Sequence, residues 1–413
     1  MTVSRDAFAS EVRAVILQMY PAATIRPLPG DFGFLVRRTA DTSLEQQLVL
    51  DNVFHETCSM DVGARRRAIV RVARMLSMLD EPIGDWEHVR QRLVPLLRSC
   101  TIDYDRAGVV FRPFAPYLIE CVGLDSDDGI MYVTPNLVQT WRVSVDEVFS
   151  VAHRTAAEVF LKDVSLYDPS APYPIWTVSR PDSYESSRLV MPGWLASFAG
   201  RVAGRPVAIV PSREVLVVGG DGDERCLRRL IEMAKSEYQK SPRSVSTALY
   251  TTDRDGRVVP LLLPKTHPLT HEVALGHMQL AMAEYGRQRD GLVEAAEEDV
   301  FVASLQGMRH SDGSVSSYAQ WSYGVPSLLP KADQIVLMLT DGMDRAAPLT
   351  ASDILCVSWA EALDIVGECL VQEPSLDPPR WRTKSWPDAA KIARLRLAAV
   401  SLRAETPAPS ELN

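Results

Sequence analysis

The sequence has no long apolar segment and no excess of positive charge. No run approaches the length of about 18 apolar residues that a membrane-spanning helix needs, and the densest run, 207–219, contains Arg213 and Glu214. Asp6 and Glu11 interrupt the N-terminal region, so we expect no signal peptide. Lys+Arg number 44 against 53 Asp+Glu, and the resulting net charge of −9 argues against general nucleic-acid binding, which depends on positive charge. We therefore expect neither membrane contact nor general nucleic-acid binding.

Cysteine is also sparse. The 413 residues contain six cysteines, without a C-x-x-C pair or a cluster. They are Cys58, Cys100, Cys121, Cys226, Cys356 and Cys369. This scatter predicts six free thiols in a reducing compartment, which favours a cytoplasmic protein, and it offers no zinc-ligand spacing. We expect no metal and no cofactor.

The motifs of common catalytic and nucleotide sites are missing as well. The loop 219–222 reads Gly-Gly-Asp-Gly, but it lacks the P-loop pattern, and Arg225 stands where G-x-G-x-x-G needs its third glycine. Asp221 and Asp223 would repel a phosphate there. We interpret the loop as a structural turn.

Three histidines lie close together in the sequence, at His267, His271 and His277. They do not form the H-E-x-x-H motif, and on a helix His271 and His277 would be about 240° apart. The acidic turn 125–129 lacks the glycine and glutamate positions of a calcium loop. We interpret the histidines as surface or cap residues and the acidic turn as a hairpin.

What is present indicates a multi-domain globular protein. At about 150 residues per domain, the length predicts roughly two to three domains. Helical patterns alternate with hairpin signals, so we predict an α+β fold of two or three layered units, with mostly antiparallel, hairpin-rich sheets flanked by helices. The expected units are an N-terminal helical region with a short hairpin (1–84), an α+β core domain (85–265), a C-terminal α+β domain (266–403) and a flexible tail (404–413). Pro264 and Pro268 preclude a regular element at the second boundary.

Several elements follow directly from residue spacing. A hairpin is predicted around 29–31, a helix over 44–58 and a second helix over 62–79. Capping boxes of the form S-x-x-E at Ser144 and Ser358 predict that helices begin there.

One pattern occurs twice. Residues 117–161 and 335–371 both read strand, acidic turn, strand, capping box and helix. Either the unit is duplicated or an arrangement common in α+β domains is used twice, and the sequence leaves both open.

The helix predicted over 62–79 carries one concentrated basic face. Its apolar stripe consists of Ile69, Val72, Leu76 and Leu79. Arg67, Arg71 and Arg74 lie opposite, and no acid occurs between Asp61 and Asp80. Such a face could bind a phosphate, a nucleic acid or an acidic protein surface, or it could simply be solvated.

A second possible surface is the aromatic, hydroxyl-rich segment 317–324, which contains Tyr318, Trp321 and Tyr323. Exposed tyrosine and tryptophan dominate interaction hot spots. The alternative is a core strand with one polar face.

Several segments resemble those of a known family. They are Leu50–Phe54, Leu93–Arg98, Ser187–Leu189, Val207–Val218, Ala248–Tyr250 and Asp255–Gly256. Over residues 44–263 the chain resembles the YtpQ-like family of bacterial proteins of unknown function. The resemblance implies an intracellular bacterial α+β protein and supplies no catalytic residues. Residues after Pro264 lie outside it.

These observations favour a non-catalytic binding or regulatory protein that engages an acidic protein partner. The predicted contact residues are Arg67, Arg71, Arg74, Tyr318, Trp321 and Tyr323. The alternative is a hydrolase or transferase whose site is assembled from residues distant in sequence. The oligomeric state does not follow from the sequence.

Overall fold

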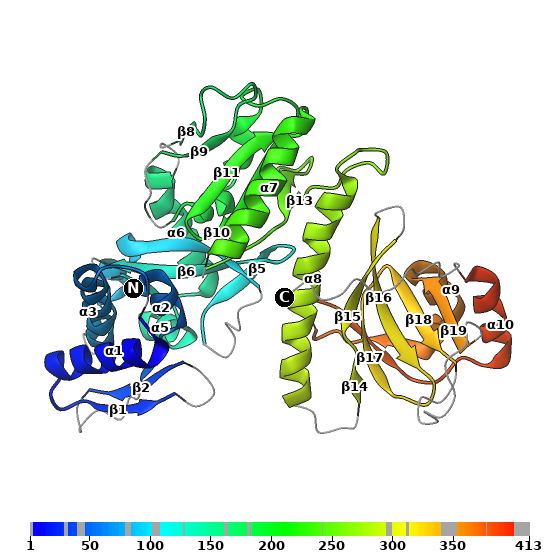
Figure 1. Cartoon of the computed structure of the whole chain (residues 1–413), viewed down its shortest axis with the longest axis horizontal. Coiled ribbons are helices and arrows are strands. Elements are labelled where there is room, and N and C mark those ends of the chain that lie inside the picture. The colour runs from blue at the N-terminus through cyan, green and yellow to red at the C-terminus, as the bar shows by residue number, and fades with distance from the viewer. Residues whose placement is uncertain are drawn as a thin grey trace.

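The structure is a computed structural model. It describes residues 3–28, 32–38, 46–78, 84–100, 108–126, 129–160, 164–179, 182, 184–241, 243–294, 300–310, 314–339, 353–376 and 378–399. Helices alternate with mostly antiparallel sheets, which confirms the predicted α+β class. Figure 1 shows three groups of elements, with the long helix α8 (Thr270–Glu294) standing beside the C-terminal sheets.

The N-terminal elements pack two helices onto a small sheet. In chain order they are α1 (Arg5–Met19), β1 (Thr24–Pro27), β2 (Gly33–Arg37), β3 (Gln46–Val49), α2 (Asp51–Thr57) and α3 (Val62–Met78). The predicted hairpin is confirmed as β1–β2, and the second predicted helix as α3. The helix predicted over 44–58 is wrong in its first part, because 46–49 pair with β2 and the helix begins only at Asp51. Hydrogen bonds to a neighbouring strand decide this segment, and its own periodicity does not show them.

The middle of the chain forms two sheets. The first has the order β4-β6-β5, with β7 also paired to β6, and the second has the order β13-β12-β10-β11-β9-β8. The strands are β4 (Leu93–Ser99), β5 (Phe111–Ala115), β6 (Leu118–Ser126), β7 (Gly129–Tyr132), β8 (Val164–Leu166), β9 (Trp176–Val178), β10 (Pro206–Ser212), β11 (Val215–Gly220), β12 (Leu249–Thr252) and β13 (Val258–Pro260). The helices are α4 (Trp86–Val89), α5 (Pro135–Trp141), α6 (Val145–Phe160) and α7 (Glu224–Lys240). As predicted, Ser144 caps α6 by accepting a hydrogen bond from Glu147 N–H at 3.1 Å.

The glycine-rich loop between β11 and α7 is a tight structural turn. A Cβ atom on Gly220 would lie 2.0 Å from the Ala203 carbonyl oxygen, so only glycine fits. Asp221 pairs with Arg205 at 2.7 Å, and Asp223 caps α7 by accepting from the Arg225 N–H at 2.8 Å. Both carboxylates therefore stabilise the turn itself.

The C-terminal elements form two four-stranded sheets, in the orders β15-β16-β18-β19 and β14-β17-β21-β20. The strands are β14 (Phe301–Val302), β15 (Leu305–Arg309), β16 (Val315–Ser322), β17 (Ser327–Pro330), β18 (Gln334–Met338), β19 (Ile354–Ser358), β20 (Leu370–Gln372) and β21 (Arg380–Thr383). Helices α9 (Trp359–Val366) and α10 (Ala389–Ala398) follow β19 and β21. Ser358 caps α9, as its capping box predicts. The duplicated pattern differs in detail, because α5 separates the β6–β7 hairpin from α6.

Helix α8 begins just after the predicted boundary and joins both sides of it. Leu269, at its start, and Leu280 pack in hydrophobic clusters of the middle sheets. Tyr285, five residues later, packs with the C-terminal sheets. One helix thus contributes to the cores on either side of Pro264–Pro268. Among the described residues, no helix is long and apolar enough to cross a membrane.

Candidate functional site

The predicted basic face is present in the folded protein, on α3. Ile69, Ala73 and Leu76 are buried against α1 and the N-terminal sheet, whereas Arg67 and Arg71 are exposed. The exposed and buried stripes are offset by two residues, about 200° around the helix, so they lie on opposite sides. Arg74 is exposed as well and also takes part in an interaction within the chain. Of the predicted apolar stripe, Leu79 lies outside the described residues.

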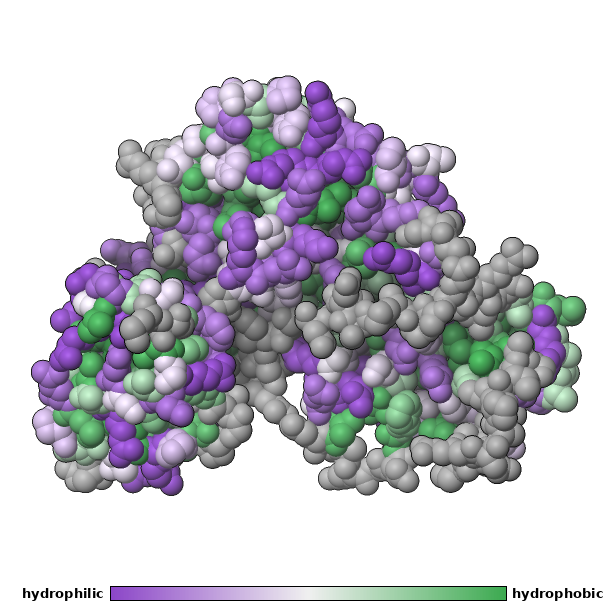
Figure 2. Space-filling model, viewed as in Figure 1, coloured by the Kyte–Doolittle hydropathy of each residue, from purple (hydrophilic) through white to green (hydrophobic). Residues whose placement is uncertain are grey.

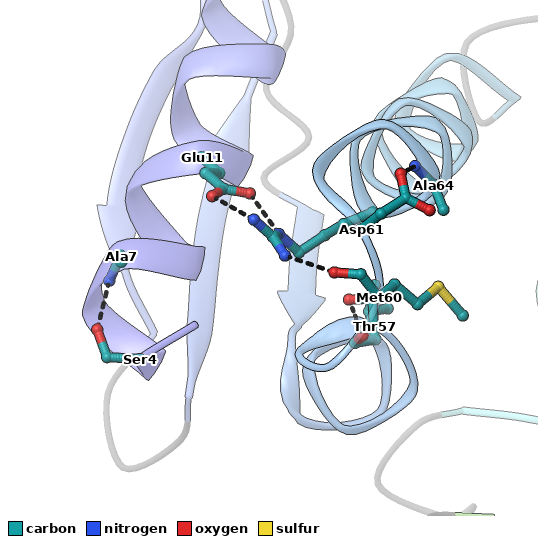
Figure 3. A network of polar contacts seen from close by, with 9 residues as sticks. Ser4, Ala7, Glu11, Thr57, Met60, Asp61 and Ala64 are labelled. Atoms are coloured by element: carbon teal, nitrogen blue, oxygen red, sulfur yellow. Dashed lines mark hydrogen bonds and ion pairs between the residues drawn. The ribbon is translucent and has the colours of Figure 1, made fainter. Parts of the chain in front are cut away.

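One arginine of this helix is used inside the fold. The Arg65 side chain is only 7% exposed, and its guanidinium donates two hydrogen bonds to Glu11 on α1, at 2.9 and 3.1 Å. A third hydrogen bond runs to the Met60 carbonyl at 3.1 Å. Figure 3 shows Glu11 facing α3 across the gap between the two helices. Arg65 therefore fixes α3 against α1 and belongs to the scaffold of the basic face.

The charges of Arg66, Arg67 and Arg71 are only weakly compensated by the described residues. Asp61 has a lowered pKa, first because it accepts a hydrogen bond from the Ala64 N–H and also because Arg67 and Arg65 are near. Arg66 donates to the neutral Gln18 side chain at 2.8 Å. Arg71 has no ion-pair partner among the described residues. Figure 2 shows hydrophilic side chains, with smaller hydrophobic areas between them, over the lower-left end of the molecule, where Figure 1 places α3.

The aromatic segment does not form the predicted surface. Trp321 is 1% exposed and lies in the C-terminal core, so its prediction as a partner contact is wrong. The cause is the period of two in β16, which turns Ala319 and Trp321 inward. Tyr318 is half-buried and donates a hydrogen bond to the Gln306 side chain. Tyr323 is exposed, and its ring contacts Trp386 at 5.4 Å between centroids.

The three histidines His267, His271 and His277 are not arranged as metal ligands. In the part of the chain that the structure describes, no three His, Cys, Asp or Glu side chains lie close enough to share a metal ion. His271 is exposed, whereas His277 is partly buried with Nε2 3.3 Å from the Leu261 carbonyl. Burial lowers the pKa of His277, so this imidazole is neutral at pH 7.

A large cavity lies where the middle sheets, α8 and the C-terminal sheets meet. Its volume is about 1110 Å³. One wall is the β5–β6 hairpin (111–119), the second is one face of α8, and the third comes from β15, β16 and turns of the C-terminal sheets. Figure 1 shows α8 between the hairpin β5 and the C-terminal strands. The sequence offers no local signal for this cavity.

Polar groups gather on one side of the cavity. Glu284 is buried and pairs with Arg287 at 2.6 Å. Burial raises the pKa of the Cys100 thiol, and Glu284 adds to the effect by its charge and by a hydrogen bond. The thiol is therefore protonated at neutral pH and is no nucleophile. Burial also raises the pKa of Tyr117, and the charges of Asp333 and Glu284 act in the same direction.

A second polar cluster lies on the sheet of β5 and β6. Glu120 is 2% exposed and binds two basic groups, His153 Nε2 at 2.5 Å and Arg112 at 2.9 Å. A carboxylate that orients a histidine is half of a nucleophile-activating arrangement. Among the described residues, no serine, threonine or cysteine is hydrogen-bonded to His153. The cluster therefore neutralises a buried carboxylate and supplies no nucleophile.

Comparison of the chain with protein-family models, with curated proteins and with solved structures finds no match. The resemblance of residues 44–263 to the YtpQ-like family accordingly stays a prediction. Any function must be argued from the chain's own residues.

Proposed function

We propose that this chain is a non-catalytic binding protein that engages an acidic protein partner through the basic face of α3, defined by Arg67, Arg71 and Arg74. The observation that carries the proposal is that the arginines of this helix differ in burial and in ion pairing. Arg65 is ion-paired with Glu11 inside the fold. Arg71, in contrast, is exposed and has no ion-pair partner among the described residues. Exposed like charges on one helix repel each other, and an acidic surface relieves that repulsion.

The rigidity of the helix supports this role. Ile69, Ala73 and Leu76 anchor α3 in the core, and the Arg65–Glu11 pair fixes it against α1. A preorganised face loses less conformational entropy on binding than a flexible loop would. The unpaired state of all six cysteines agrees with a proposed cytoplasmic location.

The test is a charge reversal with a matched control. Arg67, Arg71 and Arg74 are changed together to Glu in one variant. In the control, Arg225, Arg228 and Arg229 on α7 are changed to Glu. The net charge changes equally, but these arginines already pair with acids on or beside their own helix. Tagged wild type and both variants are used to purify bound proteins from cells that make the chain.

We expect partners that bind the wild type and the α7 control to be lost from the α3 variant. Their retention should also fall as salt rises, since exposed charges are screened over about 8 to 10 Å at physiological ionic strength. Circular dichroism should show an intact fold for the α3 variant, because the apolar stripe is untouched. Equal recovery of the same proteins by all three forms would contradict the proposal.

A further inference from the structure

Two walls of the cavity beside α8 carry apolar side chains. The β5–β6 hairpin contributes Phe111 and Phe114, and α8 contributes Met278 and Ala281. Leu262 also lines the cavity and is 77% exposed, which is unusual for a large apolar side chain. Apolar area left open to water in a concave site is the common basis of small-molecule binding.

The third wall, from the C-terminal sheets, carries an exposed cation. Lys331 lines the cavity, is exposed and has no ion-pair partner among the described residues. Arg380 directly follows the lining residue Pro379 and is fully buried. Its guanidinium is hydrogen-bonded only to uncharged oxygens in the described residues, so its charge is not cancelled locally.

Of the two acids that line the cavity, one is paired with a cation and the other is hydrogen-bonded to uncharged groups. Glu284 is paired with Arg287, and one oxygen of Asp333 accepts hydrogen bonds from both the backbone N–H and the hydroxyl of Ser317, at 2.7 and 2.8 Å. The charged residues that line the cavity are therefore two cations, Arg287 and Lys331, and two acids, Glu284 and Asp333, while Arg380 lies behind the wall. Lys331 is the lining cation that has no ion-pair partner among the described residues.

Tyr117 adds a polar group under backbone constraint. Its φ of +69° is in the left-handed region, which glycine would occupy at lower cost. The turn is held by hydrogen bonds from Cys100 N–H to the Tyr117 carbonyl and from the Tyr250 hydroxyl to the Pro116 carbonyl, both at 3.2 Å. Strained residues of this kind cluster at ligand sites, and here the strained residue lines the cavity.

We propose that this cavity binds an amphipathic organic anion of small-molecule size. The anionic group is bound at Lys331, and the apolar body lies against Phe114, Met278 and Leu262. A volume of about 1110 Å³ slightly exceeds the usual range of small-molecule pockets, about 300 to 1,000 Å³, and far exceeds what a single inorganic ion needs. The site is separate from α3 and does not depend on the function proposed above.

Two fluorescent probes distinguish charge from apolar binding. The anion 8-anilinonaphthalene-1-sulfonate and the uncharged N-phenyl-1-naphthylamine share an aromatic body. Both are titrated into the wild type, Lys331→Gln, Leu262→Glu and the control Lys235→Gln, which changes an exposed lysine of α7 that does not line the cavity. Leu262 is exposed, so its substitution leaves the core unchanged.

We expect Lys331→Gln to weaken binding of the anionic probe roughly tenfold and to leave the uncharged probe unchanged, because only a charge-assisted contact is lost. Leu262→Glu should weaken both probes, and the anionic one more strongly. Lys235→Gln should change neither. Binding of the anionic probe that is unaffected by Lys331→Gln and Leu262→Glu would overturn the proposal, as would an equal loss of both probes in Lys331→Gln.

Discussion

Arg380 provides the sharpest test of how the C-terminal sheets are held to α8. Its side chain is fully buried, and it donates to the carbonyls of Tyr285, Ala303 and Leu328 and to Gln288 Oε1, at 2.5 to 3.1 Å. One guanidinium therefore ties α8 to the strand segments β14–β15 and β17. Burial lowers the pKa of Arg380 to about 10, so it still carries its charge at pH 7.

The cost of Arg380→Met follows from the acceptors left behind. The Leu328 carbonyl keeps a hydrogen bond from the Ala303 N–H, and the Tyr285 carbonyl lies inside α8. Two acceptors, Ala303 O and Gln288 Oε1, lose the only hydrogen bond they have among the described residues. At about 1.5 kcal/mol for each unsatisfied buried group, we expect a loss of about 3 kcal/mol in the free energy of unfolding.

Arg382→Met is the matched control, because Arg382 lies two residues along the same strand. Its side chain is 40% exposed and pairs with Glu373, so its removal should cost less than about 1 kcal/mol. Urea unfolding is followed by tryptophan fluorescence, to which four tryptophans of the C-terminal part contribute, and by hydrogen exchange of β14 to β17. Similar small losses for both variants would refute the reasoning.

Two further predictions concern the pH dependence of stability and the room for a Cβ atom at two glycines. The pKa of His277 is lowered by burial, so the unfolded state takes up a proton near pH 6.5 before the folded state does. Stability should therefore fall as pH drops below about 6.5, and urea midpoints at pH 7.5 and 5.5 should show a smaller fall for His277→Gln than for the wild type or for the exposed control His271→Gln. Gly220→Ala should cost about 3 kcal/mol, because the new Cβ meets the Ala203 carbonyl at 2.0 Å, whereas Gly256→Ala should cost only about 1 kcal/mol, since its space is open and only its φ of +78° is unfavourable. Equal thermal shifts for the two glycine variants would contradict this account.

The sequence by itself determined the elements whose signals are local. The 3.6-residue period of 62–78 gave both the boundaries of α3 and its exposed arginines, because one buried stripe fixes the opposite face. The caps at Ser144 and Ser358 are equally local, since each is settled by a hydrogen bond to a residue three positions away.

Tertiary structure decided everything that depends on distant partners. Residues 46–49 form a strand because β2 offers them a hydrogen-bonding edge. Trp321 is buried because other parts of the C-terminal core cover the face of β16 toward which its side chain points. The cavity brings Tyr117 together with Glu284, some 170 residues away, and Arg380 is held by carbonyls 52 to 95 residues away in sequence. No local sequence pattern encodes contacts between such distant residues, because burial and charge pairing depend on which surfaces the folded chain brings into contact.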